Sequence, residues 1–127
     1  MKLAIAAFAL VPIAATAVHG QPGSRSGALI PALFHGRWAE NQRACGTPHF
    51  TTVITINGRG WSSFEEGGHV TRVGQVRRGT HYFRLNNHAG AEETTGSLAM
   101  RRDGARIVMT FHDDNAQPVH YTLIRCR

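Results

Sequence analysis

From Phe50 onward, apolar and polar residues alternate in a series of short runs. Turn-forming residues separate these runs at intervals of about 8 to 12 positions, a spacing typical of a β-sandwich or β-barrel. No run shows a helical period of useful length. The pattern predicts seven strands, at residues 50–57, 60–64, 69–76, 80–86, 94–101, 106–112 and 119–126.

The turns between these runs predict that consecutive strands pair as hairpins. Residues that tolerate a positive φ stand in four of them, at Asn57-Gly58, Gly67-Gly68, Arg78-Gly79 and Asp103-Gly104. Residues 34–38 add an opening strand, which brings the number to eight. Eight strands are enough to close a small barrel. The sequence therefore predicts an all-β, up-and-down meander barrel, and an open sheet folded on itself is the alternative.

Period-2 alternation assigns one side of each run to the interior of the barrel. The expected inward positions are Ile54, Ile56, Trp61, Phe83, Leu85, Leu98, Met100, Ile107, Met109, Phe111, Val119, Tyr121 and Leu123. The run at 69–76 breaks the rule, because Val70 and Val76 share a parity that Val73 lacks. This irregularity predicts a β-bulge in that strand, near Gly74.

The first residues have the three parts of a secretory signal peptide. Lys2 gives the positive start, residues 3–15 are apolar, and small residues lead to Ala17. We expect cleavage after Ala17, a flexible lead-in over 18–31 and one domain over 32–127. The apolar stretch is shorter than the roughly 20 residues that a membrane-spanning helix needs, so a periplasmic or secreted protein is expected. A retained N-terminal anchor is the alternative.

Cys45 and Cys126, the two cysteines of the chain, bracket most of this domain. A small exported domain has a thin core, and a disulfide between them would brace it. In a strict meander, however, the last strand ends beside the start of the first strand, whereas Cys45 lies beyond its far end. Either residues 39–49 fold back across the barrel mouth, or 34–38 is a turn or short helix. Two buried free thiols are the alternative to the disulfide.

Gly36-Arg37-Trp38, at the start of the first strand, carries a family resemblance. A Gly-x-Trp that opens an eight-stranded meander resembles the lipocalin and fatty-acid-binding pattern. It also resembles the small periplasmic metalloprotease-inhibitor barrels, in which a disulfide cysteine follows. The run 34–38, with Cys45 after it and 121–126 at the end, is most similar to short exported alphaproteobacterial proteins of unknown function. The resemblance implies a small disulfide-closed barrel and brings no activity or inhibitory residue with it.

The formal net charge of the chain is +6, and every basic residue except Lys2 is an arginine. We attribute this use of arginine to GC-rich codon usage, and a role in binding carboxylate or phosphate is the alternative. The arginines are scattered and do not alternate with aromatic residues, so nucleic-acid binding is not expected. Because successive turns of a meander alternate between ends, one end should gather Arg59, Arg77, Arg78, Arg101 and Arg102. We expect this end to face an anionic partner or, weakly, an anionic membrane surface.

Candidate catalytic chemistry is sparse. No nucleophile-elbow or zinc-protease motif occurs, and no catalytic residue is predicted. The acidic doublets Glu65-Glu66, Glu92-Glu93 and Asp113-Asp114 are expected at the barrel end opposite the arginines. They are interpreted as solvated hairpin tips, because neighbours in an extended chain point to opposite faces and do not form an acid–base pair.

The last hairpin offers a candidate metal site. If Phe111 lies opposite Tyr121, then His112 faces His120 on the outside of the barrel, with Asp113 adjacent. Imidazole and carboxylate ligands suit Zn or Cu. Two exposed strand histidines are the alternative interpretation, and no other cofactor is expected.

Three functions stay open on the sequence alone. The leading one is an exported, non-enzymatic binding barrel, either an inhibitor of an envelope protein or a binder of a small ligand. The second is divalent transition-metal binding through His112, His120 and Asp113, and the third is a periplasmic hydrolase. A cavity would favour a small ligand, a filled interior would favour protein binding by the loops, and convergent side chains in a cleft would favour an enzyme.

Overall fold

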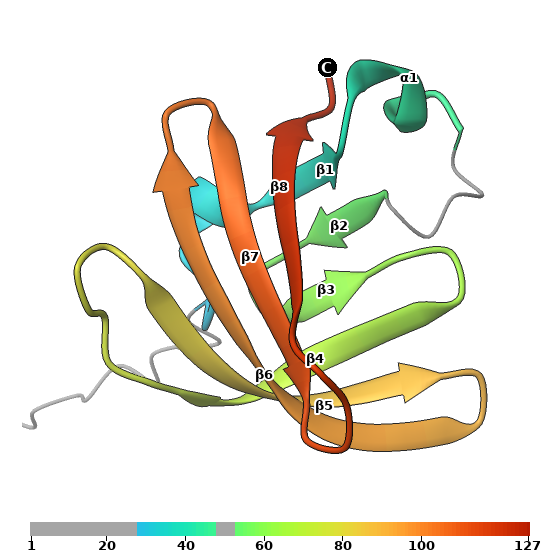
Figure 1. Cartoon of the computed structure of the whole chain (residues 1–127), viewed down its shortest axis with the longest axis vertical. Coiled ribbons are helices and arrows are strands. Elements are labelled where there is room, and N and C mark those ends of the chain that lie inside the picture. The colour runs from blue at the N-terminus through green and yellow to red at the C-terminus, as the bar shows by residue number, and fades with distance from the viewer. Residues whose placement is uncertain (1–27, 48–52) are drawn as a thin grey trace, which may run out of the picture.

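The computed structural model describes residues 28–47 and 53–127. Within them, eight antiparallel strands pair in sequence order and the last pairs with the first, so the sheet closes on itself (Figure 1). The strands are β1 (Gly36–Ala39), β2 (Ile54–Ile56), β3 (Gly60–Ser62), β4 (Glu66–Val73), β5 (His81–Ala89), β6 (Glu92–Asp103), β7 (Arg106–Asp113) and β8 (Val119–Arg125). The same residues form a short 3-10 helix, η1 (Ala32–Phe34), and a short α-helix, α1 (Gln42–Cys45). The predicted meander barrel is confirmed, and the open-sheet alternative is wrong.

The barrel closes along a seam between β1 and β8. There Trp38 lies opposite Arg125, and the backbone N–H of Cys126 donates a hydrogen bond to the carbonyl of Arg37 (2.8 Å). After β1 the chain folds back through α1, which brings Cys45 to Cys126. The two form a disulfide, with 5.5 Å between their Cα atoms. The predicted disulfide is confirmed. Of the two return paths considered, the chain takes the fold-back after β1, which is described as far as residue 47.

The opening strand begins at Gly36, later than predicted, because the residues before it form η1. Pro31 fixes φ and has no N–H, which suits the start of a helical turn. The backbone N–H of Phe34 then donates to the carbonyl of Pro31 (3.0 Å). Trp38 of β1 is fully buried, and its indole Nε1 donates to the carbonyl of Phe34 (2.8 Å). Helix and strand are therefore tied together at one end of the barrel.

Apolar side chains fill most of the barrel interior, as the alternation predicts. The buried members of the expected inward face are Ile54, Ile56, Phe83, Leu85, Leu98, Met100, Ile107, Met109 and Leu123. Trp61, Phe111 and Tyr121 are half-buried and pack against this core. Val119 lies opposite Phe111, on the predicted inward face, but it is not part of the packed core, since the residue is 45% exposed. Val119 is the first residue of β8, at an end where the core is no longer packed.

The packed domain begins before residue 32. Ile30 is fully buried, and the backbone N–H groups of Leu29 and Ile30 both donate to the carbonyl of Gly58. The last part of the expected flexible lead-in therefore belongs to the barrel. The expected signal peptide with its cleavage site, and the start of the strand expected at 50–57, lie outside the described residues. In the described part of the chain, no helix is long and apolar enough to cross a membrane.

β4 departs most from the sequence-based expectation. It starts earlier than predicted, so Gly67-Gly68 lie inside the strand and not in a turn. Its register against β5 shifts at Thr71, so the predicted bulge exists but does not lie near Gly74. β5 and β6 are also longer than predicted, because a tight turn with Gly90 at a positive φ of 60° joins them.

Candidate functional site

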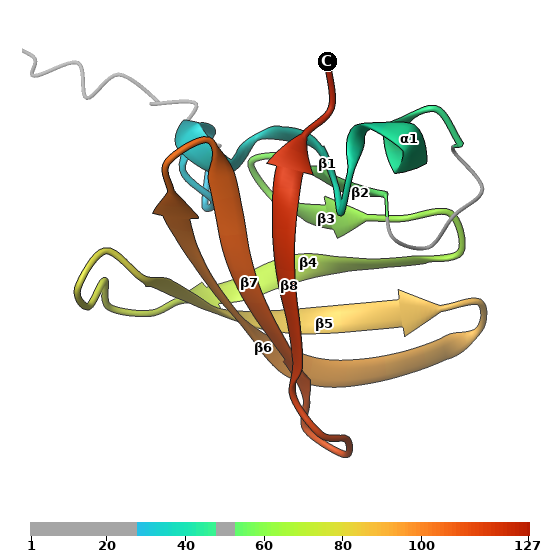
Figure 2. The same ribbon diagram turned by 45° about the horizontal axis from the view of Figure 1, so that its top comes forward.

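The connections between strands alternate between the two ends of the barrel (Figures 1 and 2). The turns β2–β3, β4–β5 and β6–β7 share one end, here called the basic end. They contain or flank Arg59, Arg77, Arg78, Arg101 and Arg102. The connections β3–β4, β5–β6 and β7–β8 share the other end, here called the acidic end. They contain or flank Glu65-Glu66, Glu92-Glu93 and Asp113-Asp114.

Packing closes the basic end. The ring of Phe34, from η1, meets the ring of His81 edge-on at 5.1 Å between centroids. Arg102 donates to the carbonyl of Leu33 in the same helix (3.5 Å), and its guanidinium lies 5.3 Å from the centroid of Trp38. Arg102 therefore takes part in the packing of the fold. Binding of an anionic partner by the other arginines of the basic end stays a prediction.

A cavity of about 220 Å³ opens at the acidic end. Each acidic doublet contributes one residue to it, because adjacent residues of a strand point to opposite faces. The contributing carboxylates are those of Glu66, Glu92 and Asp113. Five of the six doublet residues are solvent-exposed, as predicted. That one residue of each doublet also lines a cavity did not follow from the sequence pattern.

Five neighbouring strands, β3 to β7, contribute residues to the cavity. A row of paired residues crosses β3, β4, β5 and β6, in the order Trp61, Gly68, Asn87 and Thr94. The ring of Trp61 meets the ring of Phe111 edge-on, with 5.3 Å between centroids and an interplanar angle of 79°. Both rings pack against the apolar core. The cavity is therefore confined to the mouth of the barrel.

Gly68 lets the side chains of Trp61 and Asn87 lie close to the sheet. A Cβ atom at position 68 would collide with Oδ1 of Asn87 and would lie 2.6 Å from Nε1 of Trp61. Glycine is thus needed here for a close approach and not for a turn. This is the physical reason why Gly67-Gly68 does not form the turn that the sequence suggested.

The polar atoms of Asn87 and Trp61 are unusual. Asn87 is only 7% exposed. Its Nδ2 and Oδ1, together with Nε1 of Trp61, have no hydrogen-bond partner among the described residues. A buried polar group without a partner costs about 1 to 3 kcal/mol of stability. Native proteins concentrate such violations at functional sites.

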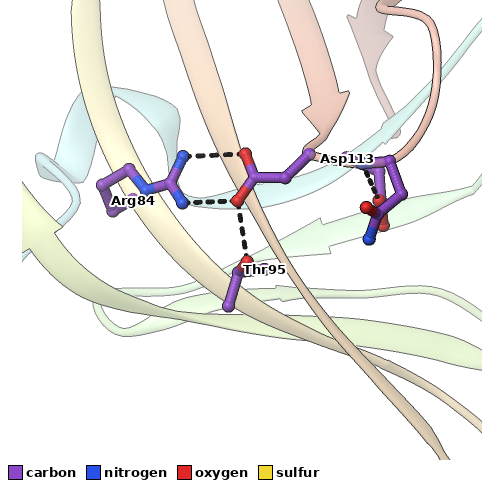
Figure 3. Close-up of polar contacts among 5 residues, drawn as sticks. Arg84, Thr95 and Asp113 are labelled. Carbon is purple, nitrogen blue, oxygen red and sulfur yellow. Dashed lines mark hydrogen bonds and ion pairs between the residues drawn. The ribbon is translucent and has the colours of Figure 1, made fainter.

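Hydrogen bonds hold the third acidic doublet on both faces of the sheet (Figure 3). On the outer face, the carboxylate of Asp114 accepts bonds from Arg84 (2.6 and 3.0 Å) and from Thr95 (2.7 Å). The hydrogen bonds from Arg84 have the largest effect, and together with the bond from Thr95 they lower the pKa of Asp114 to about 2. The pKa of Asp113 is also lowered. The larger cause is a hydrogen bond from Thr94, and the smaller one is a bond from the backbone N–H of Asn115. Both carboxylates are therefore charged at neutral pH.

We expect Asp114→Asn to reduce the loss of stability in acid. Because its pKa is lowered in the folded protein, the Asp114 carboxylate contributes stability above its unfolded pKa of about 4. That contribution is lost as the pH falls through about 2. Denaturant unfolding of parent and variant between about pH 5 and pH 2 measures the effect. The control is Glu93→Gln, because no ion pair of Glu93 occurs among the described residues. A difference between parent and Asp114→Asn that is independent of pH would contradict the expectation.

The structure does not bring the candidate metal ligands together. His120 lies opposite Thr110, whose hydroxyl oxygen is 2.9 Å from its Nδ1, and not opposite His112. His112 lies opposite Ser97 on β6. Asp113 faces the cavity, on the other side of the sheet from the two histidines. The expected register is wrong because the turn that follows Asp113 closes the hairpin at a different point.

The described residues contain no group of three or more His, Cys, Asp or Glu side chains that could hold a metal ion. Binding of Zn or Cu through His112, His120 and Asp113 stays a prediction. Asp113 lies on the cavity side of the sheet, whereas His112 and His120 lie on its outer side, so this arrangement does not support a site built from all three.

Sequence reasoning did not identify Asn87, although a signal for it exists. The alternation of β5 runs through Phe83 and Leu85 to Asn87, so an amide occupies the next inward position after two apolar residues. A polar group at such a position needs a partner or a ligand. The other parts of the site, Gly68 and the N–H of Trp61, depend on the register between strands, which the alternation does not fix.

Comparison of the chain with protein-family models, with curated proteins and with solved structures finds no match. The eight-stranded barrel and its disulfide are shown by the structure itself. The resemblance to lipocalins, to periplasmic protease-inhibitor barrels and to the short alphaproteobacterial proteins stays a prediction.

Proposed function

We propose that this protein is an exported, non-enzymatic binding protein that holds a small molecule in the cavity at the acidic end. The observation that carries the proposal is the buried side chain of Asn87, which lines that cavity and whose amide has no partner among the described residues. A polar molecule that hydrogen bonds to this amide would remove the cost of leaving it unpaired. Concave sites with a few convergent polar groups are the usual places for small ligands.

The size of the cavity at the mouth supports a small ligand over a long apolar one. Core side chains occupy the barrel up to Trp61 and Phe111, which leaves about 220 Å³ at the mouth. A long alkyl chain would have to displace this close-packed core.

The disulfide supports the proposal of export. Disulfides persist in oxidising compartments and are rare where thiols are kept reduced. Cys45 and Cys126 form such a bond, and the apolar leader at 3–15 with its small-residue exit accounts for the same compartment.

We expect Asn87→Leu to lose ligand binding and to gain stability. Leucine has a similar size and no polar group, so the ligand-free variant should be more stable than the parent by about 1 kcal/mol. A thermal-shift screen with small anionic, neutral and cationic metabolites should find compounds that raise the melting temperature of the parent but not of the variant.

Asn86→Leu is the matched control for this experiment. Asn86 is the preceding residue of β5 and is exposed on the outer face, so the same substitution there leaves the cavity unchanged. This variant should respond to ligands as the parent does. The proposal is wrong if no compound of any charge class stabilises the parent, or if Asn87→Leu responds like the parent.

A further inference from the structure

We infer that the cavity takes a small amine that carries a terminal carboxamide. The ammonium group lies among the carboxylates at the entrance, and the carboxamide lies against Asn87. This inference deepens the proposed function and rests on it. Three observations support it: the charge of the entrance, the spacing of its carboxylates, and the unpaired groups at the inner end.

The entrance of the cavity is negatively charged. Glu66, Glu92 and Asp113 line it, and no arginine or lysine is among the lining residues. Among the described residues, the carboxylate that forms an ion pair is that of Asp114, which pairs with Arg84 on the outer face of the sheet. Three acidic side chains and no arginine or lysine give the entrance an excess of negative charge. Such an entrance attracts a cation and repels an anion.

The spacing of these carboxylates favours an organic cation over a metal ion. A metal ion needs ligand atoms that converge to about 2.0 to 2.6 Å. Among residues 28–47 and 53–127, no three His, Cys, Asp or Glu side chains are grouped closely enough to hold one. Glu66, Glu92 and Asp113 belong to three different strands. An ammonium group has three diverging N–H donors and can be attracted by carboxylates that do not converge on one point.

The inner end of the cavity calls for a group that both donates and accepts hydrogen bonds. Asn87 has an unpaired donor and an unpaired acceptor, and Trp61 has an unpaired donor. A carboxamide can exchange two hydrogen bonds with the amide of Asn87, and its carbonyl has a second lone pair for the indole N–H. A simple amine lacks the acceptor. A carboxylate lacks the donor and is repelled at the entrance.

β-Alaninamide is the probe that tests this inference, because it joins an ammonium group to a carboxamide through two methylenes. Three compounds of similar length separate the two groups. Propionamide lacks the charge, propylamine lacks the amide, and succinamate has a carboxylate in place of the ammonium group. Calorimetric titration of the disulfide-bonded protein at low salt and about pH 7.5 gives the four affinities. We expect β-alaninamide to bind about tenfold more tightly than each of the others.

Glu92→Gln and Glu93→Gln form a matched pair of variants. Glu92 lines the cavity. Glu93 is the next residue of β6 and lies opposite His88 of β5. Glu92→Gln should weaken the binding of β-alaninamide about fivefold, and Glu93→Gln should leave it unchanged. Equal effects of the two substitutions would show that net charge, and not a charged entrance, attracts the ligand.

The outcomes distinguish a failure of this inference from a failure of the proposed function. Tighter binding of succinamate or propionamide than of β-alaninamide would overturn the cationic class. Propylamine that binds as tightly as β-alaninamide would overturn the role of the amide. In either case, binding that Asn87→Leu abolishes would leave the small-molecule function standing. If Asn87→Leu changes the binding of no compound in the series or in the wider screen, both are overturned.

Discussion

The double variant Cys45→Ser/Cys126→Ser is expected to lose about 4 kcal/mol of the free energy of unfolding. The disulfide joins residues 81 positions apart. For a loop of that length, the restriction of the unfolded chain is worth about 4.5 kcal/mol. In a domain of roughly 100 residues, a loss of this size lowers the melting temperature by about 20 °C. Guanidinium unfolding of parent and variant, followed by tryptophan fluorescence, measures the difference.

Reduction of the parent provides a control that changes no residue. A thiol reductant should move the unfolding curve of the parent onto that of the double variant and should leave the variant unchanged. A double variant that unfolds at the same guanidinium concentration as the oxidised parent would show that the disulfide does not stabilise the barrel.

Trp38→Ala is expected to cost about 3 to 5 kcal/mol of stability. Trp38 is fully buried, and its N–H donates to the carbonyl of Phe34 (2.8 Å). The guanidinium groups of Arg102 and Arg125 lie over its ring, at 5.3 and 4.9 Å from the centroid. Truncation removes the ring from the core and deprives both cations of their aromatic partner. It also leaves the carbonyl of Phe34 without this donor.

Urea unfolding of the oxidised protein measures the effect of Trp38→Ala. Trp38→Phe keeps an aromatic ring and loses the N–H, so its stability should fall between those of the parent and Trp38→Ala. Val76→Ala is the control, because Val76 is 55% exposed and its truncation should change stability by only about 0.5 kcal/mol. A loss for Trp38→Ala as small as that for Val76→Ala would contradict the packing role of the ring.

The barrel and its disulfide could be predicted from the sequence because each depends on a local or a simple signal. Alternation marks the strands, turn residues mark the hairpins, and two cysteines allow one pairing. Register could not be predicted in the same way. When one strand slips by two residues against its neighbour, every side chain stays on the same face of the sheet. Parity therefore placed Phe111 and Tyr121 on the correct face, but it could not show that His120 lies opposite Thr110.

The candidate site depends on register, and for this reason most of it escaped the sequence analysis. Gly68 is equally compatible with a turn and with a close approach inside a sheet. Only the pairing of β4 with β3 and β5, which places Gly68 between Trp61 and Asn87, distinguishes the two roles. The acidic doublets were correctly placed at one end. Which member of each faces inward follows from where β4, β6 and β7 begin and end, and strand boundaries are weakly encoded.

The short seam between β1 and β8 also determines how this protein is expected to fail. β1 has four residues, and the bond between Cys45 and Cys126 lies beside it. Once that bond is reduced and the seam opens, β8 becomes the free edge of an open sheet, with unpaired backbone groups along Val119–Arg125. Such an edge can take a strand from a second copy. We therefore expect the reduced protein to self-associate edge to edge. A rise in light scattering on reduction would report this association. The redox state of the surrounding compartment would then determine the solubility of the protein as well as its stability.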